Sequence, residues 1–154
     1  MRLVLQRVTR AAVTINGEER REIGPGLMVL VGICPADNEE ICAYMADKLA
    51  RLRIFGDEDG NMNLSLLDVG GACLLISNFT LYAQCKKGRR PSFIEAAPPD
   101  RAQALYESLV EQVELLGVRE LKTGRFGAHM EIDMVCDGPV TILLDSDRLM
   151  PKRG

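Results

Sequence analysis

The sequence predicts a single α/β domain in which two main helices pack on β-sheet. The 154 residues amount to about one domain, which we expect to span residues 1–154 and to bury about 70% of its unfolded surface. Hydrophobic residues make up 47% of the chain and charged residues 27%, which excludes disordered and fibrous classes. The order of apolar patterns is strands, a helix, a strand, a helix and final strands, and this order favours helices layered on sheet.

The chain is predicted to begin with a β-hairpin. Residues 2–8 and 11–15 have the pattern of strands. Asn16 and Gly17 supply the two positive-φ residues that a two-residue hairpin turn requires. Residues 18–23 are then expected to form the partner strand.

Two continuous apolar runs predict buried strands. The first run, residues 27–33, follows the break at Gly24-Pro25-Gly26, and its β-branched content indicates a strand covered on both faces. The second run, residues 72–76, comes after a polar turn at residues 56–61 and continues into polar residues at 77–81. We expect this second strand to end in polar side chains.

Two segments have the pattern of amphipathic helices. Asp37 and Glu40 have the spacing of a capping box. Apolar residues then recur at intervals of four, four and three, at Ile41, Met45, Leu49 and Leu52. The second helix is predicted to open at Pro98-Pro99-Asp100 and to stop at Gly117. Its apolar stripe consists of Leu105, Leu109, Val113 and Leu116.

The C-terminal part is predicted to return to sheet. Residues 129–136 alternate between two faces, as a strand does. Asp137-Gly138-Pro139 predicts a turn, and residues 140–144 form the last predicted strand.

The sequence predicts a cytoplasmic protein without a membrane span. Residues 1–8 lack the order of a secretory signal, and no apolar run approaches 18 residues. The cysteines are odd in number and none is spaced as C-x-x-C, so we expect reduced thiols. They are Cys34, Cys42, Cys73, Cys85 and Cys136.

The charge pattern limits nucleic-acid contact to one segment. The net charge of −3, from 22 acidic and 19 basic residues, gives no general attraction for nucleic acid. One concentrated positive stretch occurs, and any such contact is expected there. Its basic residues are Lys86, Lys87, Arg89 and Arg90.

No metal or cofactor is predicted. The acidic turn at 57–63 lacks the glycine and glutamate positions of an EF-hand, and His129-Met130-Glu131 is not followed by the P-C-x-x-C of zinc deaminases. Nucleotide-binding glycine motifs and the G-x-S-x-G motif of hydrolases are missing from the sequence. A Cys136 nucleophile with His129 as base is disfavoured, because seven positions on a strand place the two side chains on opposite faces.

Two segments with polar residues at a predicted strand end or turn remain as candidate sites. They are residues 77–81 and 136–141. The end of a strand offers unpaired main-chain N–H groups, which can stabilise an oxyanion, and hydroxyl groups there can orient a substrate. The same residues also suit a plain strand end and a plain turn.

Together these segments resemble the D-aminoacyl-tRNA deacylases, enzymes that hydrolyse the ester between a D-amino acid and tRNA. The resemblance runs from Leu5-Gln6-Arg7-Val8 to Gly138-Pro139-Val140-Thr141 and includes residues 77–81, 90–93 and 123–127. It implies a homodimer of subunits with a three-layer α/β/β fold.

Two positions depart from the family's signatures, S-Q-x-x-L and N-x-G-P-x-T. Asn78 stands where glutamine is usual, and Cys136 stands where asparagine is usual. The other signature residues are present, at Ser77, Leu81, Gly138, Pro139 and Thr141.

The resemblance also implies site residues. Ser77, Asn78, Phe79 and Thr80 would form the catalytic segment, in which main-chain N–H groups near Phe79 and Thr80 hold the oxyanion and the 2′-hydroxyl of the terminal tRNA ribose assists the water. Gly138-Pro139, joined by a cis peptide bond, would reach into the partner's pocket, where main-chain carbonyls meet the substrate's α-amino group and exclude L-residues by clash.

The expected reaction is hydrolysis of D-aminoacyl-tRNA, and of glycyl-tRNA mischarged on tRNA(Ala). The expected partners are the acceptor end of aminoacyl-tRNA, gripped by residues 86–90, and a second copy of the chain, with neither DNA nor membrane. Two alternatives are a small acyl-ester hydrolase that uses Cys136 and a non-catalytic RNA-end binder that uses residues 86–90.

Overall fold

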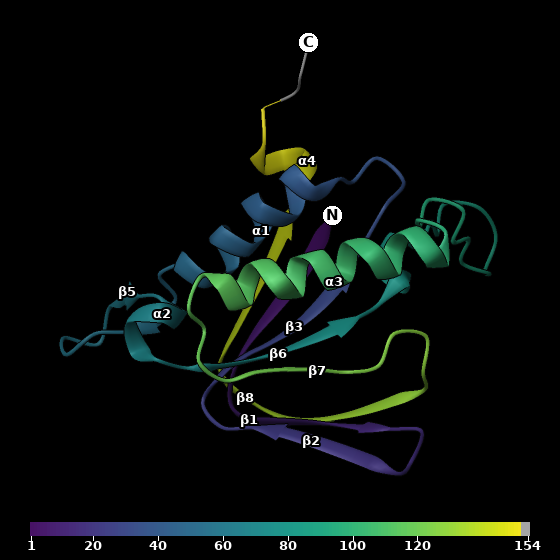
Figure 1. Ribbon diagram of the computed structural model, residues 1–154. Coiled ribbons are helices and arrows are strands. Elements are labelled where there is room, and N and C mark those ends of the chain that lie inside the picture. The colour runs from purple at the N-terminus through teal and green to yellow at the C-terminus, as the bar shows by residue number, and fades with distance from the viewer. Residues whose placement is uncertain (152–154) are drawn as a thin grey trace.

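The computed structural model describes residues 1–151, and one strongly curved sheet organises them (Figure 1). Its strand order is β2-β1-β3-β6-β7, and β8 also pairs with β1. Pairs of β1 with β2, β3 and β8 are antiparallel, whereas β3 with β6 and β6 with β7 are parallel. The strands are β1 (Arg2–Ile15), β2 (Glu19–Ile23), β3 (Gly26–Gly32), β6 (Ala72–Ser77), β7 (Leu121–Thr123) and β8 (Met130–Asp145).

Two long helices, α1 (Glu39–Arg51) and α3 (Pro99–Leu115), lie side by side over one face of the sheet (Figure 1). This arrangement confirms the predicted mixed α/β domain. The shorter elements were not predicted. They are the strand β7, a hairpin of β4 (Phe55–Gly56) and β5 (Met62–Leu64), the helices α2 (Leu66–Val69) and α4 (Ser146–Leu149), and the 3-10 helix η1 (Phe79–Tyr82).

The apolar run of β3 is buried because both faces of the strand are covered. Leu27 and Val29 belong to the core between the sheet and the helices, together with Leu49 and Leu109. Met28, between them, points to a second core on the opposite face. Each such leucine or valine contributes about 1.5–3 kcal/mol on burial, so this doubly covered strand is a major source of stability.

The first helix begins one residue later than the capping-box prediction. Asn38, not Asp37, caps α1, and its Oδ1 accepts the Ile41 N–H at 2.9 Å. Asp37 is only 1% exposed and binds the Met1 ammonium at 2.6 Å. The sequence could not show this, because the two ends of the contact are 36 positions apart.

The N-terminal hairpin is confirmed, with a longer loop and a longer first strand. Asn16 and Gly17 have φ of 51° and 70°, as the turn requires. Ile15 pairs with Glu19, so the loop holds three residues and not two. β1 is one continuous strand, and its pairing with β8 is irregular at Val8, where the prediction placed a break between two strands.

The predicted turn at Asp137-Gly138-Pro139 is wrong. The chain does not reverse there, since both flanks pair with the same strand: Cys136 with Val8, and Thr141 with Gln6. A step of two residues along β1, from 6 to 8, thus corresponds to five along β8, from 136 to 141. The intervening residues form an exposed bulge that contains the cis Gly138-Pro139 peptide.

No helix within residues 1–151 is long and apolar enough to cross a membrane.

Candidate functional site

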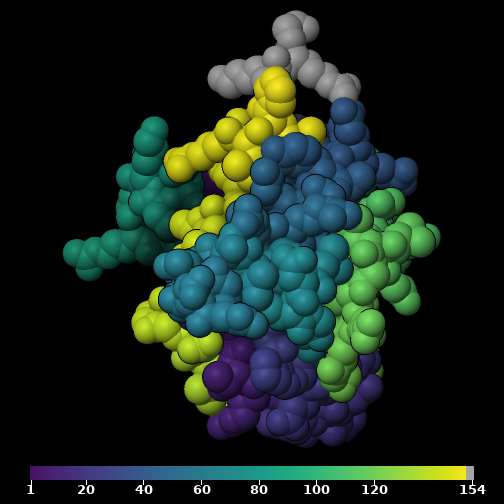
Figure 2. Space-filling view, turned by 90° about the vertical axis from the view of Figure 1, so that its left-hand side faces the viewer, coloured from purple at the N-terminus to yellow at the C-terminus, as the bar shows by residue number. Residues whose placement is uncertain are grey.

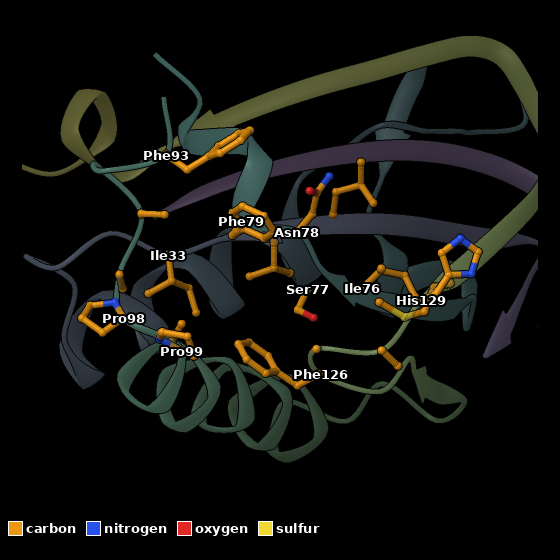
Figure 3. Close-up of a pocket in the computed structure, with 18 of the residues that line it drawn as sticks. Ile33, Ile76, Ser77, Asn78, Phe79, Phe93, Pro98, Pro99, Phe126 and His129 are labelled. Atoms are coloured by element: carbon orange, nitrogen blue, oxygen red, sulfur yellow. The ribbon is translucent and has the colours of Figure 1, made fainter. Parts of the chain in front are cut away.

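A cavity of about 770 Å³ opens at the carboxyl end of β6 (Figure 3). Its wall is mainly apolar and comes from four parts of the chain: the ends of β3 and β6, the segment 93–99, the start of α3, and the segment 126–132. Ser77, Asn78 and Phe79 lie on this wall, so the structure brings three of the four predicted catalytic residues to one cavity. Thr80 does not line it.

Asn78 links the end of β6 to η1. Its main-chain N–H donates to Val31 O at 2.7 Å, and its Oδ1 accepts the Thr80 N–H at 3.2 Å and the Thr80 hydroxyl. Asparagine is a favoured N-cap because its side-chain oxygen satisfies the first free N–H groups of a helix. Asn78 therefore shapes the backbone at the cavity edge.

The cap leaves one main-chain donor free. Among the described residues no acceptor bonds the Phe79 N–H, whereas the Thr80 N–H is already held by Asn78. Phe79 lies at the start of η1, where N–H groups lack helical partners. The structure thus offers a single unused N–H where the sequence predicted a donor from each of Phe79 and Thr80.

Close approach of η1 to β3 depends on Gly32. A Cβ at this position would lie 2.8 Å from Leu81 Cβ and 3.3 Å from Asn78 O. Only glycine leaves room for η1 against the end of β3, so the conformation at Asn78 and Phe79 depends on a residue of another strand.

Aromatic rings form much of the wall. Phe79 and Phe93 meet edge to face with ring centroids 5.0 Å apart, and Phe126 lies 6.2 Å from Tyr106. The Tyr106 hydroxyl donates to Leu75 O at 2.7 Å, and burial raises the pKa of this phenol well above its usual value. Tyr106 therefore stays neutral and fixes α3 to β6 behind Phe126.

The predicted chirality residues lie outside this cavity. Gly138 and Pro139 are exposed on the β8 bulge and do not line the cavity of their own chain. Arg7 holds the bulge, since its guanidinium donates to Asp137 O at 3.3 Å and to Ile54 O at 2.8 Å.

The predicted tRNA-binding residues lie on a loop that is closed by pairing of Gln84 with Ser92. Lys86, Lys87, Arg89 and Arg90 are all exposed there. The segment protrudes from the body of the molecule (Figure 2). Phe93 follows it directly and lines the cavity, so the positive loop begins beside the cavity rim.

Cys136 and His129 are not brought together as a catalytic pair. His129 lines the cavity, whereas Cys136 does not, and the Cys136 thiol lies 3.8 Å from Gln6 Oε1. Gln6 Oε1 also accepts the Thr141 hydroxyl at 2.6 Å. Within residues 1–151, no three His, Cys, Asp or Glu side chains converge as a metal site would require.

The sequence analysis missed part of the wall. Pro98 and Pro99 were interpreted only as a helix start, and Phe126 only as part of a resembling segment, yet all three line the cavity. No periodic signal marks these residues, because their common surface exists only after β6, α3 and the segment before β8 have assembled.

Comparison of the sequence with those of known proteins identifies the family of this chain. The sequence profile of D-Tyr-tRNA(Tyr) deacylase matches residues 4–145. D-aminoacyl-tRNA deacylases from Geobacillus sp. (strain WCH70) and Bacillus velezensis are 53% and 54% identical over 146 residues, which is 95% of this chain and 95% and 99% of theirs.

Two solved structures have a fold similar to that of this chain. One titled "c-Myc DNA Unwinding Element Binding Protein" has a TM-score of 0.88 at 42% identity and covers 95% of this chain and 99% of its own. A probable eukaryotic D-amino acid tRNA deacylase has the same fold, with a TM-score of 0.82 at 19% identity over 93% of this chain and 97% of its own. With its profile matched over residues 4–145, the chain belongs to the D-Tyr-tRNA(Tyr) deacylase family.

Proposed function

We propose that the protein hydrolyses D-aminoacyl-tRNA to a free D-amino acid and tRNA, a chiral proofreading step in translation. The observation that carries this proposal is the unused Phe79 N–H at the edge of an apolar cavity, next to Ser77. Membership of the deacylase family and relatives named D-aminoacyl-tRNA deacylase support it. We extend the proposed substrates to glycyl-tRNA mischarged on tRNA(Ala), since a site that rejects L-side chains by clash does not exclude glycine.

The proposed step is addition of water to the ester carbonyl. The water oxygen bonds to the carbonyl carbon, the Phe79 N–H stabilises the negative charge on the carbonyl oxygen, and Ser77 orients the substrate. The bond from the carbonyl carbon to the ribose oxygen then breaks, and the ribose oxygen takes up a proton. The neighbouring ribose 2′-hydroxyl is the proposed relay for the water's proton, so the protein need supply neither a nucleophile nor a cofactor.

We propose that the working unit is a homodimer of three-layer α/β/β subunits. Separate cores on the two faces of the sheet support the layers. Support for the dimer comes from β8, where Met134, Val135 and Leu143 are exposed apolar side chains on either side of the bulge. In the dimer, Gly138-Pro139 of each subunit enters the partner's cavity, where its main-chain carbonyls distinguish D-aminoacyl from L-aminoacyl esters.

We propose that the acceptor end of tRNA binds along the positive loop. We also propose that the protein acts in the cytoplasm and that residues 1–154 form a single deacylase domain. Lys86, Lys87, Arg89 and Arg90 neutralise phosphates there, so affinity decreases with salt. The last three residues of that range lie outside the part of the chain that the structure describes.

Parallel hydrolysis assays on D-tyrosyl-tRNA and L-tyrosyl-tRNA, without added metal or nucleotide, test the function. We expect rapid release of D-tyrosine, retention of the L-ester, and no inhibition by a chelator. Tight tRNA binding without turnover would instead support the RNA-end binder. Loss of turnover in Cys136→Ser, with folding intact, would support the thiol hydrolase.

A further inference from the structure

Residues 124–129, here called the pocket loop, connect β7 to β8 and form one wall of the cavity. Phe126, Gly127, Ala128 and His129 all line the cavity. Only two main-chain bonds hold the loop to itself and to β6: Ala128 N–H to Arg125 O at 3.2 Å, and Gly124 N–H to Leu75 O at 3.2 Å. The position of this wall therefore depends on contacts from elsewhere in the molecule.

Those contacts come from the β1–β2 hairpin. At one end of the loop, Arg21 Nη1 donates to Thr123 O at 2.8 Å and to Gly124 O at 3.4 Å. At the other end, Asn16 N–H donates to His129 O at 2.8 Å, and Asn16 Oδ1 accepts the His129 N–H at 3.2 Å. Between them, Glu19 binds Arg125 at 2.7 Å and Arg21 at 3.0 Å.

The bonds of Arg21 and Glu19 join two edges of the sheet that share no backbone ladder, whereas the Asn16–His129 bonds extend the β1–β8 pair. β2 and β7 stand at opposite ends of the strand order. Side chains bridge them: besides Arg21, Lys122 Nζ donates to Glu22 O at 2.6 Å. Because side chains make this closure, a single substitution can loosen it while every strand pair stays intact.

The loop has little room to shift without moving the cavity wall. A Cβ at Gly124 would overlap Met130 Sδ and would lie 3.1 Å from Ile76 Cδ1. Met130 and Ile76 both line the cavity. A displacement at Gly124, where Arg21 is anchored, is therefore transmitted to the substrate-facing surface.

The contacts between the hairpin and the pocket loop differ in how strongly they stabilise the loop. The Glu19–Arg125 pair is about half exposed on both sides, and such ion pairs contribute little. The bond from the Arg21 guanidinium to Thr123 O is partly buried and charge-assisted, which makes it the stronger anchor.

We propose that Arg21 is a positioning residue for substrate binding, because it fixes the pocket loop and hence the Phe126 wall. This inference rests on the proposed function. Arg21 makes its hydrogen bonds to Glu19, Thr123 and Gly124 and none to Ser77 or Phe79, so its loss weakens binding of the ester and leaves the chemical step at the β6 end unchanged.

The test compares Arg21→Met with Arg20→Met in assays on D-tyrosyl-tRNA. Arg20 is the matched control, since it is a neighbouring arginine of β2 whose ion pairs are with Asp133 and Glu22 and not with the pocket loop. We expect Arg21→Met to raise KM about tenfold with kcat within about twofold, because the charged hydrogen bonds to Thr123 O and Gly124 O are lost. Arg21→Lys should recover part of the loss, and Glu19→Gln and Arg20→Met should stay close to wild type.

Hydrogen exchange of residues 124–129 gives a readout that does not depend on catalysis. Protection should decrease in Arg21→Met and stay unchanged in Arg20→Met. Unchanged KM and unchanged protection in a folded Arg21→Met protein would overturn the proposal, as would a loss confined to kcat or equal effects in both variants. If Arg21→Met does not fold, Arg21→Lys must show the same KM-selective change. Wild-type protein that fails to hydrolyse D-tyrosyl-tRNA refutes the proposed function, and the exchange data then still decide whether Arg21 holds the loop.

Discussion

At the residue scale, the site depends on which polar groups the fold leaves unsatisfied. The Thr80 N–H and hydroxyl are both taken by Asn78, whereas the Phe79 N–H is not used by any described residue. Thr80 is the fourth residue of the predicted catalytic segment. In the structure its hydroxyl stabilises the cap of η1 and lies outside the cavity wall.

Phe79→Pro should abolish most hydrolysis. Proline is compatible with the first position of a helix, and the extended Asn78 before it, at φ −149° and ψ 94°, suits the residue that precedes a proline. The substitution therefore deletes the free N–H with little change to the backbone, and it also removes the ring that packs on Phe93, as the control variant does. We expect kcat to decrease by about 100-fold or more. Phe79→Leu, which keeps the N–H, is the control. Equal activity of the two variants would show that this donor is not the oxyanion site.

The buried thiol of Cys73 makes the free energy of unfolding depend on pH in the alkaline range. Burial raises the pKa of this thiol from 9.0 to about 12. The unfolded chain releases the proton near pH 9 while the folded protein keeps it, so the free energy of unfolding decreases from pH 9 towards 12 by about 1.4 kcal/mol per pH unit.

Urea unfolding at pH 8 and pH 10 measures this effect. Cys73→Ala should lose less stability between the two pH values than wild type, by about 1 kcal/mol. Cys85→Ala, which removes an exposed thiol, should keep the wild-type difference. Identical losses in wild type and Cys73→Ala would contradict the assignment.

At the scale of elements, the cavity is formed where the ends of strands meet short connecting segments. β3 and β6 run parallel and end at the same edge, and η1 packs there on Gly32. The segment 93–99 closes another side, where Ala97 N–H donates to Ile33 O at 2.9 Å. The long elements supply the core, and the short ones supply the site.

Gly32→Ala should therefore affect activity more than folding. The new Cβ would lie 2.8 Å from Leu81 Cβ and push η1 away from β3. Overpacking of this kind costs about 1–3 kcal/mol, which a domain of this size tolerates, but the Phe79 N–H moves with η1. Gly24→Ala is the control, since nothing lies within 4 Å of its added Cβ. We expect lower kcat in Gly32→Ala alone, while thermal melts show both proteins folded. Full activity in a folded Gly32→Ala protein would contradict a role for η1 placement.

At the scale of the whole molecule, the β8 bulge displays the groups that we propose to act between subunits. Gly138 and Pro139 stand out from the sheet, and Arg7 secures the bulge from β1. Exposed apolar side chains lie before and after it on the same strand. This surface, and not the helical face, is the one that we propose for the second copy.

Leu143→Lys tests that surface, and Leu115→Lys is its matched control. Both leucines are 74% exposed, but Leu143 lies on β8 and Leu115 at the end of α3. A buried lysine charge without a partner is strongly unfavourable at an interface. Sedimentation should therefore show monomers for Leu143→Lys and dimers for Leu115→Lys, and discrimination between D- and L-tyrosyl-tRNA should weaken only in the monomer. A fully selective monomeric variant would refute a site completed by the partner.

The sequence by itself determined the elements whose signals are local. The apolar runs of β3 and β6 predicted strands, the three- and four-residue spacing predicted α1, Pro98-Pro99 and Gly117 marked the limits of α3, and Asn16-Gly17 predicted the hairpin. The motifs at 77–81 and 138–141 predicted the family and three residues of the cavity wall.

Tertiary structure decided what depends on distant partners. Asp37 and Asn38 both suit a helix cap, and only the Met1 ammonium, which binds Asp37, separates their roles. Gly138-Pro139 has the composition of a turn, yet pairing of both flanks with β1 makes it a bulge. Phe126 joins the cavity because Arg21, more than a hundred positions away, holds the loop that carries it. Local pattern encodes local backbone preference, whereas these outcomes follow from hydrogen bonds and packing between segments that meet only when the sheet has closed.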